Sequence, residues 1–278
     1  MSQQQIHDFQ SMVWDYFETH GRHDLPWRLP TDRGFDPYAI MVSEIMLQQT
    51  QVGRVIPKFQ AFMKQFPTVQ ALASAPLSDV LQAWSGLGYN RRAKFLWQAA
   101  QQVVTDYAGV MPKTLEELVR LPGIGKNTAG AIMAYAYDQP VYFIETNIRT
   151  VYIHHFFADE TTVADKQLEP VIVATIANLD VGKRSARHWY WALMDYGTHL
   201  KQTVGNAGRK STAYARQSTF EGSKRQIRGR VLALLQQPMS LAELQEYITD
   251  ERLGDVLSDL TRESMISCAK DVYVLGSA

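Results

Sequence analysis

Apolar residues recur at spacings of three and four along most of the chain, which is the pattern of helices that bury one face. The segments that show it up to residue 200 are 9–20, 37–66, 78–107, 114–121, 127–137, 146–157, 168–179 and 186–200. Strand-like alternation of apolar and polar residues is nearly absent before residue 264. Short stretches rich in Gly and Pro separate the segments. The pattern therefore predicts an all-α fold with short connections.

The pattern changes after residue 200. The next stretch is polar and basic without a clear period, which indicates a linker or a surface arm. Three short helices are then expected, at 224–236, 240–248 and 252–264, followed by a hairpin at 265–275. Three helices and a hairpin are the outline of a winged helix-turn-helix. The expected domains are a helical domain over 1–200, a basic linker or arm over 201–223, and a small winged-helix-like domain over 224–278.

Composition indicates a globular chain. Its 278 residues, 46% of them hydrophobic, can bury a sizeable core in one large or two moderate domains. No apolar run approaches the roughly 18 residues of a membrane span, and the first ten residues lack the features of a signal peptide. We therefore expect a cytoplasmic protein without membrane contact. The single cysteine, Cys268, cannot form an internal disulfide or a multi-cysteine metal site.

The charges are balanced overall but separated along the sequence. There are 28 basic and 28 acidic residues, and such a balance argues against a nucleic-acid partner. Residues 201–230, however, hold eight basic residues against one acid, Glu221. From residue 231 to the end, eight acids stand against three bases. We therefore expect the two signs to lie on different surfaces.

The stretch LPGIGK, residues 121–126, predicts a sharp turn between two helices. Gly123 and Gly125 free the backbone to turn, and the second helix begins near Lys126 with its unpaired N–H groups facing outward. Such a corner can hold a phosphate through the amides and the helix dipole, to which Lys126 adds charge. Taken alone, a stretch of this kind more often marks a plain turn between two helices.

Four further stretches accompany this turn in a fixed order. The five are HGRHDLPWR (20–28), SEIMLQQTQV (43–52), GLGYNRRAKFLWQAA (86–100), TLEELVRLPGIGKNTAGAIMAYA (114–136) and IETNIRTV (144–151). Together they resemble the MutY-type adenine DNA glycosylases of the helix-hairpin-helix superfamily, over roughly residues 7–200. The resemblance implies a two-part helical fold. It also implies an enzyme that flips a mispaired or damaged base out of double-stranded DNA and hydrolyses its N-glycosidic bond, at work on the nucleoid of a prokaryote.

Glycoside cleavage suggests the catalytic residues. Breaking the bond builds positive charge on the sugar and negative charge on the departing base, so the site needs an acid near the base and a carboxylate near the sugar. Glu44 lies among apolar residues, where burial would raise its pKa and keep it protonated for a purine ring nitrogen. Glu145 opens a helix after an apolar run, where it could stabilise an oxocarbenium ion. An isolated Glu is usually a cap or a surface residue, and the resemblance favours catalysis here.

The resemblance implies roles for further residues, each with an ordinary alternative. They are Trp27, Arg28, Leu47, Val52 and Trp191 in the base pocket, Gln49 and Tyr89 inserted into the base stack, Asn147 beside the sugar, and Gly123, Gly125 and Lys126 on DNA phosphates. The basic charge of the arm, and not the resemblance, predicts phosphate contacts for Arg209, Lys210 and Arg216. The alternatives are core packing for the pocket residues, a buried polar contact for the inserted pair and a helix cap for the asparagine.

The chain also departs from the family. Bifunctional members of the superfamily carry a Schiff-base lysine two residues after the last hairpin glycine, where this chain has Asn127. Lys126 lies one residue earlier, about 100° away around the helix. The resemblance therefore implies a phosphate contact for Lys126 and a monofunctional enzyme in which water attacks the sugar. Glu145 stands in place of an aspartate, and Trp191 in place of a Glu or Gln that contacts adenine.

Two parts of the family's pattern are missing. Four cysteines that would ligate an iron–sulfur cluster are absent, so we expect neither metal nor cofactor. The basic arm is expected to bind DNA in place of the cluster loop. The Nudix-like domain that recognises 8-oxoguanine opposite the adenine is absent too. The expected third helix of the tail carries Asp255, Asp259 and Glu263, a poor surface for a phosphate backbone. We therefore expect residues 224–278 to pack on the catalytic domain or to bind a protein partner.

These features leave several functions open. The leading interpretation is a monofunctional glycosylase that removes adenine from a mispair. The substitutions at Glu145 and Trp191 favour a second, a glycosylase for a modified or mismatched pyrimidine. A third is a helix-hairpin-helix protein that binds DNA without catalysis, and a fourth is a lyase or nuclease that uses Lys126 as its amine.

Overall fold

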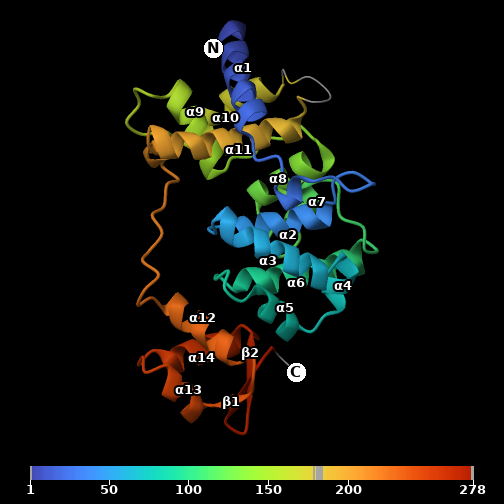
Figure 1. Cartoon of the computed structure of the whole chain (residues 1–278), viewed down its shortest axis with the longest axis vertical. Coiled ribbons are helices and arrows are strands. Elements are labelled where there is room, and N and C mark those ends of the chain that lie inside the picture. Colours follow the sequence, from blue (N-terminus) through green and yellow to red (C-terminus); the bar gives the residue numbers. More distant parts are fainter. Residues whose placement is uncertain (1, 178, 180–183, 277–278) are drawn as a thin grey trace. The chain divides into compact units, whose positions relative to one another are not determined.

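The computed structural model describes residues 2–177, 179 and 184–276 and is dominated by helices (Figure 1). The all-α prediction is therefore confirmed, apart from a small sheet near the C-terminus. The chain forms two compact units. The first comprises Met1–Met41, Lys113–Val119 and Ile124–Arg216, and the second comprises Val42–Pro112, Arg120–Gly123 and Gln217–Ala278. Across the described residues, every helix is too short or too polar to span a membrane.

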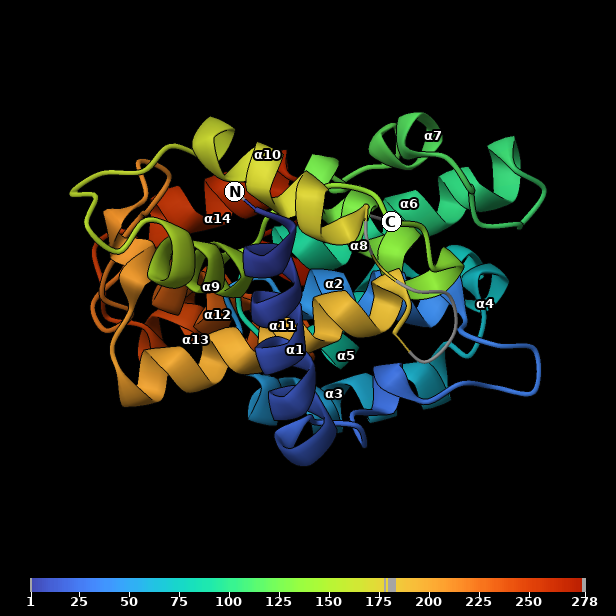
Figure 2. The same ribbon diagram turned by 90° about the horizontal axis from the view of Figure 1, so that it is seen from above.

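The first unit is built around its longest helices. Its elements are α1 (Gln3–His20), η1 (Pro26–Arg28), α7 (Leu115–Val119), α8 (Lys126–Tyr137), α9 (Thr146–Phe156), α10 (Asp165–Ile176), α11 (Ala186–Thr203) and η2 (Ala207–Lys210). Figure 2 shows α1 lying across α11, with which it is in contact. Trp189 of α11 lies in that contact, with its ring 5.3 Å from that of Trp14 and 5.8 Å from that of Phe9. The apolar stripes predicted from the sequence thus form the core of this unit.

Helix α2 (Pro37–Leu47) leads into the second unit, which continues with α3 (Val52–Gln65), α4 (Val69–Ser74), α5 (Leu77–Trp84) and α6 (Arg91–Asp106). The sequence predicted single helical segments over 78–107 and 37–66, but the chain turns between α5 and α6 and also between α2 and α3. Gln49 adopts a left-handed backbone in that turn, with φ of 55°. Apolar spacing does not reveal this break, because the apolar residues on either side keep the helical period.

The C-terminal part of the second unit has the predicted winged-helix outline. Its elements are α12 (Lys224–Leu234), β1 (Met239–Ser240), α13 (Leu241–Tyr247), α14 (Leu253–Arg262), β2 (Ile266–Ala269) and β3 (Val272–Leu275). The strands form an antiparallel sheet in the order β1-β3-β2, with Cys268 opposite Tyr273. Lys270 and Asp271, with φ of 50° and 62°, form the hairpin turn. The predicted hairpin is confirmed, and β1 is an additional strand of two residues.

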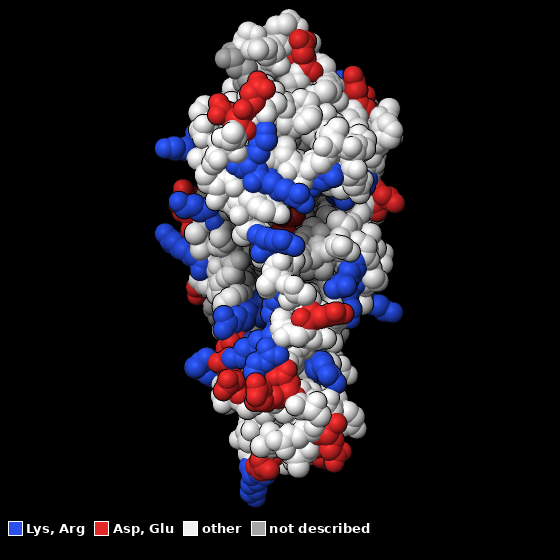
Figure 3. All heavy atoms as spheres, turned by 90° about the vertical axis from the view of Figure 1, so that its left-hand side faces the viewer, with Lys and Arg blue, Asp and Glu red and all other residues white. Residues whose placement is uncertain are grey.

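Acidic residues of this C-terminal part are paired with basic residues of the same unit. Glu263 forms ion pairs of 2.5 Å with Arg91 at the start of α6 and with Arg228 of α12. Asp259 pairs with Lys224 at 2.7 Å. Figure 3 shows Asp and Glu side chains directly beside Lys and Arg side chains at the level of α12 and α14. The expectation that the two signs lie on different surfaces is therefore wrong for these residues, because folding pairs segments that the sequence separates.

Candidate active site

A buried arginine, Arg92, ties together two turns of the second unit. Its guanidinium donates to the carbonyl oxygens of Ile45 at 2.7 Å, Met46 at 3.0 Å and Gln48 at 2.6 Å, at the carboxyl end of α2. It also donates to the carbonyl oxygen of Gly88 at 3.1 Å, in the turn before α6. Burial lowers the pKa of Arg92 to about 10, which leaves it charged at neutral pH. A single fixed cation thus holds both turns in place.

Arg92 was not predicted from the sequence, although a signal was present. Arg92 belongs to the buried face of α6 together with Leu96, Ala99 and Val103. A charged residue on an apolar helical stripe must satisfy its donors inside the protein. That reasoning identifies a structural arginine, but it does not identify which carbonyl groups the guanidinium reaches.

Gln49 and Tyr89, the two residues expected to enter the base stack, stand in the turns that Arg92 holds. Both have left-handed backbones, with φ of 55° and 48°, and Gln49 is exposed. Tyr89 is half-buried, and its hydroxyl accepts hydrogen bonds from Gln217 and Arg225. Its ring centre lies 5.5 Å from the guanidinium of Arg92 and 5.0 Å from that of Arg225. Insertion into DNA stays a prediction for both residues.

Glu44 lies on α2, one turn before the carboxyl end of the helix. Its neighbours Ser43 and Ile45 are buried, whereas Glu44 itself is half-buried. Leu47 ends the helix and Val52 begins α3, and both are half-buried. Leu47 and Val52 therefore do not belong to the buried core. Their role in the base pocket stays a prediction.

The two glycines of the LPGIG turn differ in whether the backbone requires a glycine. Gly123 has φ of 76°, and a Cβ atom there would lie 2.7 Å from Cβ of Phe95. Gly125 has φ of −87°, and a Cβ atom there would meet nothing, so the expectation that both glycines serve the turn holds only for Gly123. Lys126 begins α8 and is exposed, without a hydrogen bond or ion pair to any described residue. The arrangement leaves the amino end of α8 open to an anion.

Asn127, which stands at the place of the superfamily's Schiff-base lysine, orders the chain before α9. Its Oδ1 accepts a hydrogen bond of 3.3 Å from the backbone N–H of Ile144. The next residue, Glu145, is half-buried and occupies the N-cap position of α9 with an extended backbone. Its side chain makes no capping hydrogen bond, so the alternative of a plain helix cap is wrong. A carboxylate at this end of a helix is stabilised in its charged form by the helix dipole.

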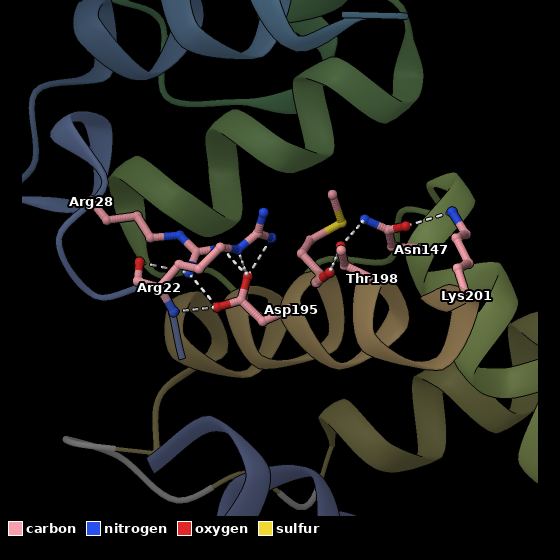
Figure 4. Close-up of polar contacts among 7 residues, drawn as sticks. Arg22, Arg28, Asn147, Asp195, Thr198 and Lys201 are labelled. Atoms are coloured by element: carbon pink, nitrogen blue, oxygen red, sulfur yellow. Dashed lines mark hydrogen bonds and ion pairs between the residues drawn. The ribbon is translucent and has the colours of Figure 1, made fainter. Parts of the chain in front are cut away.

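Asn147 lies in the first turn of α9, but its side chain points to α11 instead of capping its own helix (Figure 4). Its Nδ2 donates to Oγ1 of Thr198 at 3.2 Å, and its Oδ1 accepts from Nζ of Lys201 at 2.5 Å. Gly197 permits this approach of the two helices, because a Cβ atom there would lie 2.5 Å from the carbonyl oxygen of Asn147. Thr198 and Lys201 were not predicted from the sequence, since nothing in their spacing indicates a partner on α9.

A buried ion pair holds Asp195, which lies on α11 one turn before Thr198 (Figure 4). Asp195 accepts from Arg28 at 2.8 and 2.9 Å and from Arg22 at 2.7 and 2.5 Å. Burial alone would raise the pKa of Asp195, but the hydrogen bonds and charges of the two arginines outweigh it and lower the pKa. The structure thus gives Arg28 a partner that the sequence did not indicate. Its place in the wall of a base pocket stays a prediction.

Trp191 belongs to an aromatic cluster of the first unit. Its ring stacks on that of Tyr135 at 5.9 Å, meets the ring of Phe35 edge-on at 5.5 Å and lies 5.2 Å from the guanidinium of Arg28. Trp191 is buried, and Trp27 is buried as well. This packing fits the core alternative for both tryptophans, and contact with a base stays a prediction.

The basic residues after α11 differ in how far they are available to DNA. Lys210 of η2 donates its Nζ to the carbonyl oxygen of Ala158 at 2.6 Å, and its own carbonyl accepts from the N–H of Val163 at 2.9 Å. Arg209 and Arg216 are exposed. Lys210 therefore anchors the segment to the first unit, while the two arginines are open to solvent.

The segment after α11 does not fit an iron–sulfur cluster. The only cysteine of the sequence, Cys268, lies in β2 of the second unit. Within the described residues, no group of three His, Cys, Asp or Glu side chains could hold a metal ion. Packing orders the segment instead, since a Cβ atom on Gly208 would lie 2.8 Å from Oγ1 of Thr150. No step of the chemistry below involves a cluster.

Comparison with known proteins identifies the family. Residues 42–171 match the HhH-GPD superfamily of base excision DNA repair proteins. An adenine DNA glycosylase of Mycobacterium tuberculosis is 33% identical over 289 residues, which cover 96% of this chain and 92% of that protein. A match of this extent includes most of the C-terminal winged-helix part as well.

Two further comparisons differ in extent. An adenine DNA glycosylase of Buchnera aphidicola is 35% identical over 62% of this chain, which spans 47% of that protein's length. The structure of a thermostable thymine-DNA glycosylase superposes with a TM-score of 0.59 at 25% identity, covering 70% of this chain and 86% of that one. The fold, the superfamily match and the near full-length relative agree with the resemblance seen in the sequence. The chain belongs to the family of MutY-type adenine DNA glycosylases, within the helix-hairpin-helix superfamily of base excision DNA repair proteins.

Proposed function

We propose that the protein is a monofunctional DNA N-glycosylase that removes adenine from a mispair in double-stranded DNA. The observation that carries this proposal is the 33% identity to an adenine DNA glycosylase over 96% of the chain. The superfamily match over residues 42–171 includes both candidate carboxylates, Glu44 and Glu145. The proposal therefore assigns a reaction to residues that lie in the matched region.

Glu145 is proposed to stabilise the sugar as the glycosidic bond breaks. The bond from the sugar C1′ atom to the base nitrogen lengthens, and positive charge develops on the sugar ring. Because Glu145 stands at the amino end of α9, the helix dipole favours its charged form. A water molecule then forms the new bond to C1′, and its proton passes to solvent or to a carboxylate. The place of Asn127 beside Ile144 supports this assignment by ordering the chain just before Glu145.

Glu44 is proposed to protonate the departing base. The base leaves with the electron pair of the broken bond, and a proton on a purine ring nitrogen neutralises that charge. Glu44 is half-buried in a turn of α2 whose carbonyl groups are held by Arg92. Its helix is therefore fixed at the end where the acid stands, and partial burial favours the protonated form.

Contacts with DNA are proposed for the open cations and amides. The amino end of α8 with Lys126 suits a phosphate group, as do the exposed side chains of Arg209 and Arg216. Lys126 is exposed at the first position of α8, one residue before Asn127. We therefore propose that it binds phosphate without acting as a nucleophile, so that the enzyme has no lyase activity.

A second candidate is removal of a mismatched pyrimidine. The structural likeness to a thymine-DNA glycosylase at 25% identity favours it, together with Glu145 in place of aspartate. A pyrimidine leaves as a stabilised anion and depends less on protonation than a purine does. The two candidates therefore differ in how strongly they need Glu44.

The proposal is tested with duplexes that each carry one defined mispair. The set contains adenine opposite guanine, adenine opposite 8-oxoguanine, and thymine opposite guanine. We expect release of free adenine. The abasic strand should stay uncleaved until it is treated with alkali. Release of thymine alone would favour the second candidate. Tight duplex binding with no base released from any member of the set would contradict both.

A further inference from the structure

Lys201 is a half-buried cation whose partner is neutral. Its Nζ donates to Oδ1 of Asn147 at 2.5 Å, and it makes no ion pair with any described residue. Burial lowers the pKa of Lys201, and the charge of Arg149 on the facing helix lowers it further. Arg149 is itself paired with Asp165 of α10 at 2.8 Å. The energetic cost of burying Lys201 is thus not offset by an acidic side chain.

Lys201 lies in the last turn of α11, where the dipole of its own helix favours a cation. Its ammonium nevertheless reaches the first turn of α9, where the helix dipole is positive and a cation is unfavourable. A neutral side chain at this contact would avoid that cost and the cost of burying a charge. We therefore expect the ammonium to contribute more than a contact between two helices.

The hydrogen bonds fix the orientation of the Asn147 amide. Thr198 donates its single hydroxyl proton to the carbonyl oxygen of Met194 at 2.9 Å, so its oxygen can only accept from Nδ2 of Asn147. The ammonium of Lys201 can only donate, so it requires Oδ1 on its side. A flipped amide would place two donors against each other and two acceptors against each other. Lys201 and Thr198 together therefore set which way the amide group points (Figure 4).

This orientation leaves one amide hydrogen of Asn147 unused. The second N–H of Nδ2 has no acceptor among the described residues, and neither do two of the three ammonium hydrogens of Lys201. Asn147 stands two residues after Glu145 on the first turn of α9. The open amide donor of Asn147 therefore lies in the segment that begins with the proposed sugar-side carboxylate, and the open ammonium donors of Lys201 lie on α11.

We propose that Lys201 is a positioning residue for base excision, which holds Asn147 with its free N–H ready to donate to a sugar or phosphate oxygen of the target nucleotide. This inference rests on the proposed glycosylase function, because it concerns how the sugar is held during that reaction. Lys201 acts through Asn147. A bond from a charged donor is stronger than one from a neutral donor, which suits a side chain that must not rotate during the reaction.

The test is a double-mutant cycle in single-turnover base release. We expect Lys201→Met to slow release by about tenfold to a hundredfold, as for the loss of a charged hydrogen bond, with duplex affinity changed by less than about threefold. Lys201→Arg should restore most of the rate. Combined with Asn147→Ala, Lys201→Met should add little further loss, because both changes remove the same contact. The matched control is Lys166→Met, an exposed lysine of α10 that should behave as the wild type.

Two outcomes would overturn the inference while leaving the glycosylase intact. One is an unchanged rate in Lys201→Met, and the other is a double variant whose loss is the product of the two single losses.

A second measurement does not depend on activity. In side-chain amide NMR spectra, Lys201→Met should shift the Asn147 resonances and Lys166→Met should not. Unshifted resonances would refute the positioning contact, whereas a wild type that releases no base would refute the proposed function instead.

Discussion

The half-buried His155 is a single residue that makes the free energy of unfolding depend on pH. Burial and, to a smaller extent, the charge of the neighbouring His154 lower the pKa of His155 from its ordinary value of 6.5 to about 4. Between these values the unfolded chain binds a proton that the folded protein does not, so the free energy of unfolding falls as the pH falls from about 6.5 to about 4. We expect a loss of about 1–2 kcal/mol over that window, since the partial exposure of the ring screens the effect.

The check on His155 is a set of urea titrations between pH 4 and pH 7. His155→Phe keeps an aromatic ring against Phe9 and removes the titrating group, so it should flatten the pH dependence in this window. His154→Phe is the matched neighbouring change and should leave most of the slope. Equal slopes in the wild type and in His155→Phe would show that other groups cause the pH dependence.

Single residues were predicted unevenly from the sequence. Glu145 and Asn147 were assigned by resemblance, and the structure places both in the first turn region of α9. Lys201 and Arg92 were missed, because each acts through a contact with a segment more than 40 residues away. Apolar spacing describes one helix at a time and does not indicate which polar groups of two helices meet. Such partners become visible only in the folded structure.

At the scale of elements, the C-terminal part is attached to α6 by charge. The carboxylate of Glu263 pairs with Arg91 and Arg228, and its backbone oxygen accepts from Lys94. Burial would raise the pKa of Glu263, but the hydrogen bonds of the two arginines outweigh it and lower the pKa. Glu263→Gln should therefore lower the free energy of unfolding by about 1–2 kcal/mol, because one of the two arginines is largely exposed.

The measurement for Glu263→Gln is the midpoint of urea unfolding at neutral pH. Glu246→Gln, on the exposed side of α13, is the control and should leave the midpoint unchanged. The loss should also shrink in high salt, where ion pairs are screened. A midpoint equal to that of the control would mean that the ion pairs do not hold α14 in place.

Long elements were predicted well, whereas among the short ones α7 and α13 were predicted and α4 and β1 were missed. The repeated apolar spacing of α1, α6 and α11 extends over several turns, so the sequence shows them clearly. The six residues of α4 and the two of β1 are too short to establish a period. The winged-helix outline was nevertheless predicted correctly, because it depends on the order of its elements and not on the length of each.

At the scale of the whole molecule, the family was visible from the sequence because its motifs follow one another along the chain. The resemblance implied a two-part helical fold, but it did not indicate which segments form each of the two compact units. Each unit is assembled from three separate stretches, so the chain passes between them several times. The sequence gives only the order of the segments, and long-range packing decides which of them form a unit. The zero net charge was likewise a poor predictor of whether the chain has a nucleic-acid partner, because acidic and basic residues of the C-terminal part neutralise each other.

Glu44 and Glu145 are the residues proposed to break the glycosidic bond. The most direct test is single-turnover base release by Glu44→Gln and Glu145→Gln on the preferred mispair. We predict that each change slows release by at least about a hundredfold while duplex affinity stays nearly constant. Glu169→Gln, an exposed change on α10, serves as the control. Base release at the wild-type rate by both variants would contradict the account, and a loss confined to Glu145→Gln would replace adenine by a pyrimidine as the substrate.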